Sequence, residues 1–319
     1  MLANLVLSLV IDYIAKYYQI LFISLVGVLW VTYDSVRKVL VNRIKLLPLL
    51  IFLECGQGLV YFLYAYFTGN LIFTVDYLLP GLVTAIFAAS GTFLLTYSIS
   101  ISPLSSVIPF LSFLPFFTVI FGALILKESM TLFQLIGLIL LVLASFIINF
   151  KGKKVNSFLG LFAQLYKDLI SERGCVLMIL TSLLWAFAIP FDKISMGFVG
   201  PYSHALYHSI SSGCIFAIAR IFSKKTPWGT SKYLYGHNFN SSKWFILLGV
   251  INAATALLLQ FIAYQNFDVG FVESYKRAVS LIANLFIGFL IFKEPINKFK
   301  IFGTLCVLFA TFLILGIVK

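Results

Sequence analysis

Charged side chains are scarce in this sequence. Asp, Glu, Lys and Arg make up 11% of its 319 residues, hydrophobic residues make up 61%, and the mean hydropathy is +1.04. This composition leaves too little polar surface to cover a water-soluble globule of that length. The apolar stretches are about 20 residues long, which suits a helix that crosses a bilayer and exceeds the length of a membrane β-strand. The sequence therefore predicts an all-α integral membrane protein.

Paired cysteine spacings, an early basic cluster and cofactor motifs are missing as well. The four cysteines, Cys55, Cys175, Cys214 and Cys306, lie singly within apolar runs, which disfavours disulfides and a zinc site. Residues 1–19 lack the pattern of a removable signal, so we expect an interfacial helix there. No nucleophile/base pair, phosphate-cradling loop or nucleotide motif is evident, so we predict neither an enzyme, nor a cofactor, nor a primary pump.

The formal net charge of +12 comes mostly from short connections between the apolar runs. In such connections Lys and Arg meet lipid headgroups and set the orientation in the membrane. We therefore predict contact with the lipid bilayer and none with nucleic acid.

Charged or Pro/Gly-containing breaks divide the chain into ten expected spans. These are 20–36, 47–67, 77–98, 104–126, 132–150, 175–196, 201–222, 244–264, 270–292 and 299–318. We expect a first five-helix repeat at 1–150, a basic linker at 151–173 and a second five-helix repeat at 174–319.

The two halves share residues at fixed spacing. Pairs at an offset of 166 (288 minus 122) are Gly122/Gly288, Lys127/Lys293, Glu128/Glu294 and Gly137/Gly303. Near the start of each half, Leu29, Trp30 and Lys38 match Leu184, Trp185 and Lys193 at an offset of 155 (185 minus 30). Because five spans per half is an odd number, the second half enters the membrane in the opposite orientation. The sequence predicts two inverted repeats.

These paired Leu-Trp and Lys-Glu motifs resemble the ten-helix EamA-type branch of the drug/metabolite transporter superfamily, over essentially the whole chain. The resemblance implies substrate movement by alternating access, through a cavity lined mainly by the first, third and fourth helices of each half. It fixes no substrate, since relatives export amino acids, take up metabolites or S-adenosylmethionine, or expel drugs.

The ninth span carries three charges, Glu273, Lys276 and Arg277. Their i, i+3, i+4 spacing places the carboxylate on one face with both cations and leaves one positive charge over. We interpret the cations as contacts for an anionic group of a substrate, with Arg suited to a bidentate carboxylate or phosphate. The alternative is a self-neutralised triad whose cations reach the interface. The matching residues of the first half, 107–111, are uncharged.

Other polar residues have two interpretations each. Glu54 either receives a substrate ammonium or takes up a proton for coupling, or it is a protonated carboxyl bonded within the bundle. His204 and His208 are one turn apart, but no further ligand is evident, so we reject a metal site. Lys38 and Lys193 are gate candidates, although interfacial anchoring is the simpler interpretation.

The fourth span has three prolines, Pro103, Pro109 and Pro115, so we expect a kinked helix that lines the cavity, with serines or water meeting the freed carbonyls. Aromatic side chains near the expected cavity would stack on a planar substrate. The remaining candidate substrate-binding residues are Trp30, Tyr33, Trp185, Tyr275, Ser106 and Asn284.

We hypothesise a secondary transporter of a small polar metabolite, amino-acid-like or of the S-adenosylmethionine type, driven by a proton or a counter-substrate. The alternative is a multidrug exporter, which the expected net positive cavity disfavours, and a membrane enzyme or scaffold is a further alternative. We expect a bacterial inner membrane. Gly137 and Gly303 would serve either a homodimer or internal packing.

Orientation has two opposing indications. The resemblance implies cytoplasmic termini, whereas that placement puts most basic connections outside, against the positive-inside bias. The orientation and the direction of transport stay open.

Overall fold

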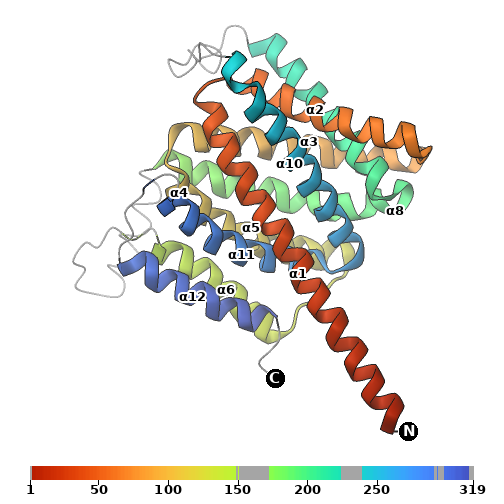
Figure 1. The fold of residues 1–319 in the computed structure, drawn as a ribbon, viewed down its shortest axis with the longest axis vertical. Helices are drawn as coiled ribbons and strands as arrows, with labels where there is room; N and C mark the ends of the chain where they lie inside the picture. The colour runs from red at the N-terminus through yellow and green to blue at the C-terminus, as the bar shows by residue number, and fades with distance from the viewer. Residues whose placement is uncertain are drawn as a thin grey trace.

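The computed structural model describes residues 2–148, 150, 172–223, 239–290, 293 and 298–315, and these are helical apart from short connections (Figure 1). Side chains of residues 2–17, 105, 239–241 and 288 lie outside the description. The long helices are α1 (Leu2–Val41), α2 (Leu46–Thr68), α3 (Leu78–Ile101), α6 (Leu132–Ile148), α8 (Arg173–Phe222), α10 (Phe239–Asn266), α11 (Val269–Leu290) and α12 (Lys298–Ile314). The basic linker 151–173 lies almost wholly outside the described residues.

Helix α8 contains two of the expected spans. Gly200 has φ 74° and ψ 167°, a left-handed φ that only glycine adopts readily, and Pro201 follows it. The helix axis therefore breaks between 175–196 and 201–222, where the sequence predicts a boundary. With this break, the described part of the chain holds ten helical segments, and six of its helical stretches, with α8 counted once, are long and apolar enough to cross a membrane. This agrees with the predicted all-α membrane fold.

Helix α1 is longer than its expected span. It runs without interruption from Leu2 to Val41, so the segment 1–19 continues the first span as helix instead of standing apart from it. In Figure 1 its first turns project away from the other helices. An interfacial position for these turns stays a prediction.

The fourth span is broken, as its prolines predict. It consists of α4 (Leu104–Val107), the 3₁₀ segment η2 (Ile108–Ser112), α5 (Phe113–Phe121) and the π segment η3 (Gly122–Leu126). A serine of another helix helps to satisfy the irregular backbone, because the Ser182 hydroxyl of α8 lies 3.4 Å from the carbonyl oxygen of Phe110.

The two halves pack against each other in matching pairs. Helix α1 packs on α10 and α11, while α8 packs on α3 and α5; α6 packs on α12, and α2 packs on α8. Glycines allow the closest approaches at equivalent positions. A Cβ at Gly137 would lie 2.8 Å from the carbonyl oxygen of Ala310, and one at Gly303 would lie 2.5 Å from Ile148 Cγ1. Both glycines therefore serve contacts between the halves within one chain.

A second glycine pair repeats the pattern. Gly58 of α2 lies against Ile210 of α8, and Gly213 of α8 lies against Cys55 of α2. Gly58 and Gly213 are 155 residues apart (213 minus 58), the offset of the first part of the repeat. Lys127 and Lys293 likewise share a positive φ, 59° and 52°. Local geometry therefore follows the predicted repeat.

The recurring lysines cap equivalent helix ends. Lys38 donates to the carbonyls of Ile99 and, at 2.9 Å, Ser102, where α3 ends. Lys193 donates to the carbonyl of Phe267 at 2.9 Å, where α10 ends. The two lysines lie near the ends of spans one and six, which an odd repeat places at opposite membrane faces. Each lysine thus stabilises the end of the third helix of its own half.

Glu128 also binds Lys193, the lysine that caps the end of α10. Its carboxylate accepts from Lys193 Nζ at 2.7 Å and from the backbone N–H of Val269 at 2.8 Å, at the start of α11. A carboxylate at a helix N-terminus is favourable because unpaired N–H groups and the helix dipole meet it there. This ion pair connects the first half to the second.

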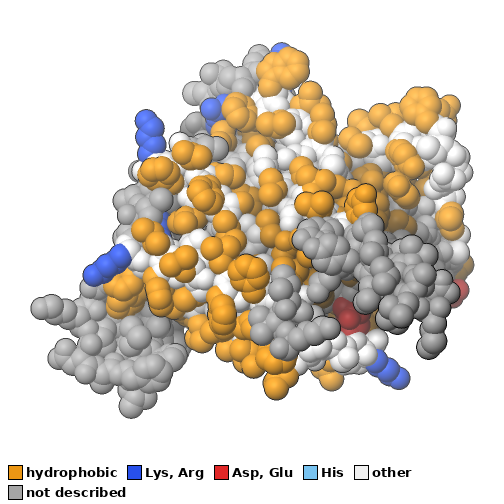
Figure 2. Space-filling model, turned by 60° about the horizontal axis from the view of Figure 1, so that its bottom comes forward, with side chains coloured by type: hydrophobic (Ala, Val, Ile, Leu, Met, Phe, Trp, Pro, Cys, Tyr) orange, Lys and Arg blue, Asp and Glu red, His pale blue; other side chains and the backbone are white. Residues whose placement is uncertain are grey.

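The outer surface is apolar. Figure 2 shows one face covered mainly by hydrophobic side chains, with Lys and Arg at its margins. Many large hydrophobic side chains are exposed, among them Phe286, Phe302, Phe309 and Phe312 of α11 and α12. A surface of this kind suits contact with lipid tails.

We expect Gly137→Ala to lower the free energy of unfolding by about 1–3 kcal/mol, because overpacking at a close helix contact forces the helices apart. Gly197→Ala is the matched control, since nothing lies within 4 Å of a Cβ there. The measurement is thermal unfolding in detergent. Equal stability of the two variants would contradict the role of Gly137 in internal packing.

Candidate functional site

A cavity lies between the two halves, and its empty space, including solvent at its open side, is about 650 Å³. Residues of α1, α3, η2, α8, α10 and α11 line it, so every wall but one comes from the helices that the resemblance implies. The additional wall is the second segment of α8, through His208. Among its described lining residues are the aromatic side chains Trp30, Trp185, Phe261 and Tyr264 and the polar side chains Asp34, Asp192, His208, Gln260, Glu273, Lys276 and Arg277.

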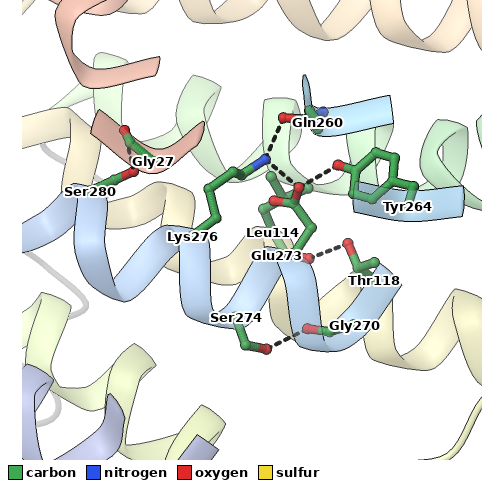
Figure 3. Close-up of polar contacts among 10 residues, drawn as sticks. All are labelled: Gly27, Leu114, Thr118, Gln260, Tyr264, Gly270, Glu273, Ser274, Lys276 and Ser280. Carbon is green, nitrogen blue, oxygen red and sulfur yellow. Dashed lines mark hydrogen bonds and ion pairs between the residues drawn. The ribbon is translucent and has the colours of Figure 1, made fainter. Parts of the chain in front are cut away.

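Helices α10 and α11 hold a buried polar cluster in one wall (Figure 3). Lys276 Nζ donates to Gln260 Oε1 at 2.7 Å and also pairs with the carboxylate of Glu273. The hydroxyl of Tyr264 donates to the same Glu273 oxygen. Lys276 and one oxygen of Glu273 therefore have partners on their own wall, whereas the other Glu273 oxygen is buried without one among the described residues.

Close packing positions this cluster against α1. A Cβ at Gly27 would lie 3.1 Å from the carbonyl oxygen of Lys276, and the Ser280 hydroxyl donates to the Gly27 carbonyl at 3.2 Å. The absent side chain lets α1 approach the backbone of α11. Trp30, one turn further along α1, thereby reaches a position 6.0 Å from Lys276 Nζ, measured to its ring centroid.

Arg277 differs from Lys276 in having no hydrogen-bond partner among the described residues, and its Nε is buried without one. The side chain is 5% exposed and lines the cavity. Asp34 of α1 is near enough for the two charges to interact, but its Oδ1 lies 3.3 Å from Arg37 NH1. Arg277 therefore presents guanidinium donors to the cavity.

Asp192 of α8 is a buried cavity carboxylate that the sequence interpretation missed. It accepts from the Thr84 hydroxyl of α3, and its Oδ1 lies 3.0 Å from His204 Nε2. The other ring nitrogen of His204 lies 3.1 Å from the hydroxyl of Tyr77. The sequence did contain a signal for this residue, because Asp192 is a carboxylate within the expected span 175–196 and directly precedes the recurring Lys193.

Five of the ten candidate binding residues line the cavity, and five lie elsewhere. Those in the lining are Trp30, Trp185, Glu273, Lys276 and Arg277. The indole N–H of Trp185 donates to the carbonyl of Ala88 at 3.1 Å, which fixes the ring orientation in the wall. The indole N–H of Trp30 has no partner among the described residues.

Tyr33 and Glu54 lie behind the cavity wall. Tyr33 is buried beneath the guanidinium of Arg37, 4.2 Å from its ring centroid. Glu54 is buried on α2 beside Gly213 of α8, where the charge of Arg37 acts on it. Packing between α2 and α8 turns this carboxylate away from the cavity.

Tyr275, Ser106 and Asn284 also lie outside the lining. The hydroxyl of Tyr275 is 3.0 Å from Ser24 Oγ on α1, because its position lies on another face of α11 from residues 273, 276 and 277. Ser106 accepts a thiol hydrogen bond from Cys175 at its carbonyl, 3.7 Å away. Asn284 lies two turns, about 10 Å, beyond Arg277 and donates to the Ser280 carbonyl at 2.9 Å.

The expected net positive cavity is wrong for the described lining. Three carboxylates line it, from Asp34, Asp192 and Glu273, against the two cations Lys276 and Arg277. The expectation counted α11 alone, and packing adds carboxylates from α1 and α8. Each carboxylate has at least one partner, however, and Arg277 is the cation in the described lining that has no hydrogen-bond partner.

The buried Glu273–Lys276 pair generates a stability prediction. We expect Lys276→Met to destabilise the protein by about 3–5 kcal/mol, because it leaves a buried carboxylate without its cation. The double variant Glu273→Gln/Lys276→Met should recover much of that loss. Thermal unfolding of the three proteins in one detergent checks this, and a double variant no more stable than Lys276→Met would contradict the pairing.

Comparison with known proteins agrees with this architecture. A model of the EamA-like transporter family matches residues 18–150 and 172–316, one match in each half. No curated protein matches the sequence significantly. A solved structure described only as the crystal structure of a protein superposes with a TM-score of 0.65 over 94% of this chain and 96% of that chain, at 12% identity, which shows likeness of fold. The chain belongs to the EamA-like transporter family and is a multi-pass integral membrane transporter.

Proposed function

We propose that this protein is a secondary transporter of a small polar metabolite that carries an anionic group, amino-acid-like or of the S-adenosylmethionine type. The observation that carries the proposal is Arg277, a buried guanidinium that lines the central cavity without a hydrogen-bond partner among the described residues. Buried charge is costly within a membrane, so an unpartnered cation there calls for an anionic ligand.

The chemistry of the walls supports this substrate class. The planar fork of an arginine matches a carboxylate or phosphate with two parallel hydrogen bonds. Trp30, Trp185 and Phe261 supply apolar surface for the remaining part of the substrate.

Multidrug export is the competing function. Apolar cations require acidic groups that are free to receive them, and the cavity does contain three carboxylates. Asp34 is bonded to Arg37, Asp192 to Thr84 and His204, and Glu273 to Lys276 and Tyr264. A cationic drug would have to displace these partners from every bonded oxygen and would find only the second Glu273 oxygen without a partner among the described residues, whereas an anion would displace none from Arg277.

The inverted repeat supports alternating access. The cavity lies where the halves meet, and lysine caps recur at Lys38 and Lys193, which the repeat places at opposite faces. Opening one end requires separating helix ends that one of these lysines connects. We propose that exchange or an ion gradient drives the cycle.

We expect Arg277→Ala to abolish counterflow of the substrate, and Arg277→Lys to reduce it strongly because a lysine cannot form the bidentate contact. The measurement is counterflow into proteoliposomes preloaded with amino acids, nucleosides and S-adenosyl compounds, read by mass spectrometry. Arg220→Ala, which removes an exposed arginine near the end of α8, is the matched control.

Three outcomes discriminate between the functions. Selective exchange of an anionic or zwitterionic compound, lost in Arg277→Ala and kept in Arg220→Ala, supports the proposal. Unchanged exchange in Arg277→Ala contradicts the role of this residue. Exchange of apolar cations alone would favour the multidrug exporter.

A further inference from the structure

A hydrogen-bonded chain leads from the cavity towards one edge of the bundle. It begins at Asp192, which lines the cavity, continues through His204 Nε2 at 3.0 Å, and ends at the Tyr77 hydroxyl, 3.1 Å from His204 Nδ1. All three side chains are buried, whereas the preceding residue, Asp76, is exposed. Tyr77 closes the short 3₁₀ segment η1 (Val75–Tyr77) that leads into α3.

We propose that Asp192 and His204 form the proton-binding site that couples transport to a proton gradient, with Tyr77 relaying protons between this pair and the adjacent membrane surface. The inference rests on the proposed transport function and names its coupling ion. A carboxylate and an imidazole in direct contact share one exchangeable proton, and they change by one charge when a second proton binds.

The proton balance follows from the hydrogen bonds. With Asp192 ionised, His204 donates from Nε2 to the carboxylate and accepts at Nδ1 from the Tyr77 hydroxyl. An incoming proton binds the Tyr77 oxygen while the original hydroxyl proton moves to Nδ1, and the Nε2 proton then passes to Asp192. The pair ends neutral, with a carboxylic acid at the cavity wall and the other tautomer of His204.

Neutralisation of Asp192 changes the electrostatic potential within the cavity, because this carboxylate lines it. Tyr77 of η1 and Thr84 of α3 face the pair; from the second segment of α8, His208 does; and from α10, Tyr264 does. Glu273, Lys276 and Arg277 of α11 and Asp34 of α1 line the same cavity. Loss of one negative charge therefore alters the field that a bound anion meets at Arg277.

This geometry favours Asp192 and His204 over Glu54 as the proton carrier. Glu54 also lies buried in the bundle, but it is outside the cavity lining and makes no hydrogen bond to a described residue. A proton on Glu54 would act on the substrate site only through Arg37, Tyr33 and the helices between. Asp192 is at once a cavity wall and the first member of a hydrogen-bonded chain.

One test requires no substrate. Infrared difference spectra of the reconstituted protein between acidic and alkaline buffer should show a carboxylic-acid band that Asp192→Asn removes and His204→Gln shifts. Asp268→Asn, at an exposed carboxylate before α11, is the matched control and should leave the band unchanged. A band that persists unaltered in Asp192→Asn would overturn the proton site, whatever the substrate proves to be.

The second test concerns coupling. Accumulation driven by a pH gradient is divided by counterflow of the same compound, so that general losses of activity cancel. We expect this ratio to collapse in His204→Gln and Asp192→Asn, to stay at the wild-type value in Asp268→Asn, and to fall less in Tyr77→Phe, which keeps the ring contact but removes the relay hydroxyl. An unchanged ratio in His204→Gln, or a wild-type protein that exchanges substrate without responding to the gradient, would overturn the coupling role. If no compound exchanges, the transport proposal fails while the infrared test still decides proton binding.

Discussion

The cost of charge within a bilayer governs this structure. Glu273 and Lys276 form an ion pair on α11, and Tyr264 and Gln260 of α10 are hydrogen-bonded to it. That contact places a polar wall in the centre of a bundle whose outer face is apolar. Arg277, the next residue, keeps its donors directed at the cavity, where the proposed anionic substrate would offset the same cost.

The two halves pack alike at equivalent positions but carry different chemical groups at others. Gly58 and Gly213, like Gly137 and Gly303, bring equivalent helices together, because both halves need the same close approach. Arg37 and Asp192, however, occupy equivalent positions 155 residues apart and carry opposite charges. The two halves therefore share their packing, while the unlike residues differ in position relative to the cavity: Asp192 lines it, whereas Arg37 is outside the described lining.

Sequence reasoning succeeded where local pattern is sufficient. Hydropathy and length predicted the ten helical segments. The break at Gly200–Pro201 and the interrupted fourth span followed from residues whose backbone behaviour is intrinsic. It failed for Tyr275 and Asn284, which were placed at the site because they share a helix with Arg277. Their faces and heights on α11 direct them to α1 and beyond the cavity instead.

The sequence by itself determined the membrane class, the ten helical segments, the repeat and the run of charges in the ninth span, because hydropathy, length and spacing are properties of the chain alone. Only the tertiary structure decided which charges are satisfied and which face the cavity. Asp192, His204 and Tyr77 come from different segments, and their spacing in the sequence does not predict that they are in contact. A helix fixes which residues share a face, but the neighbour that this face meets depends on how all the helices pack.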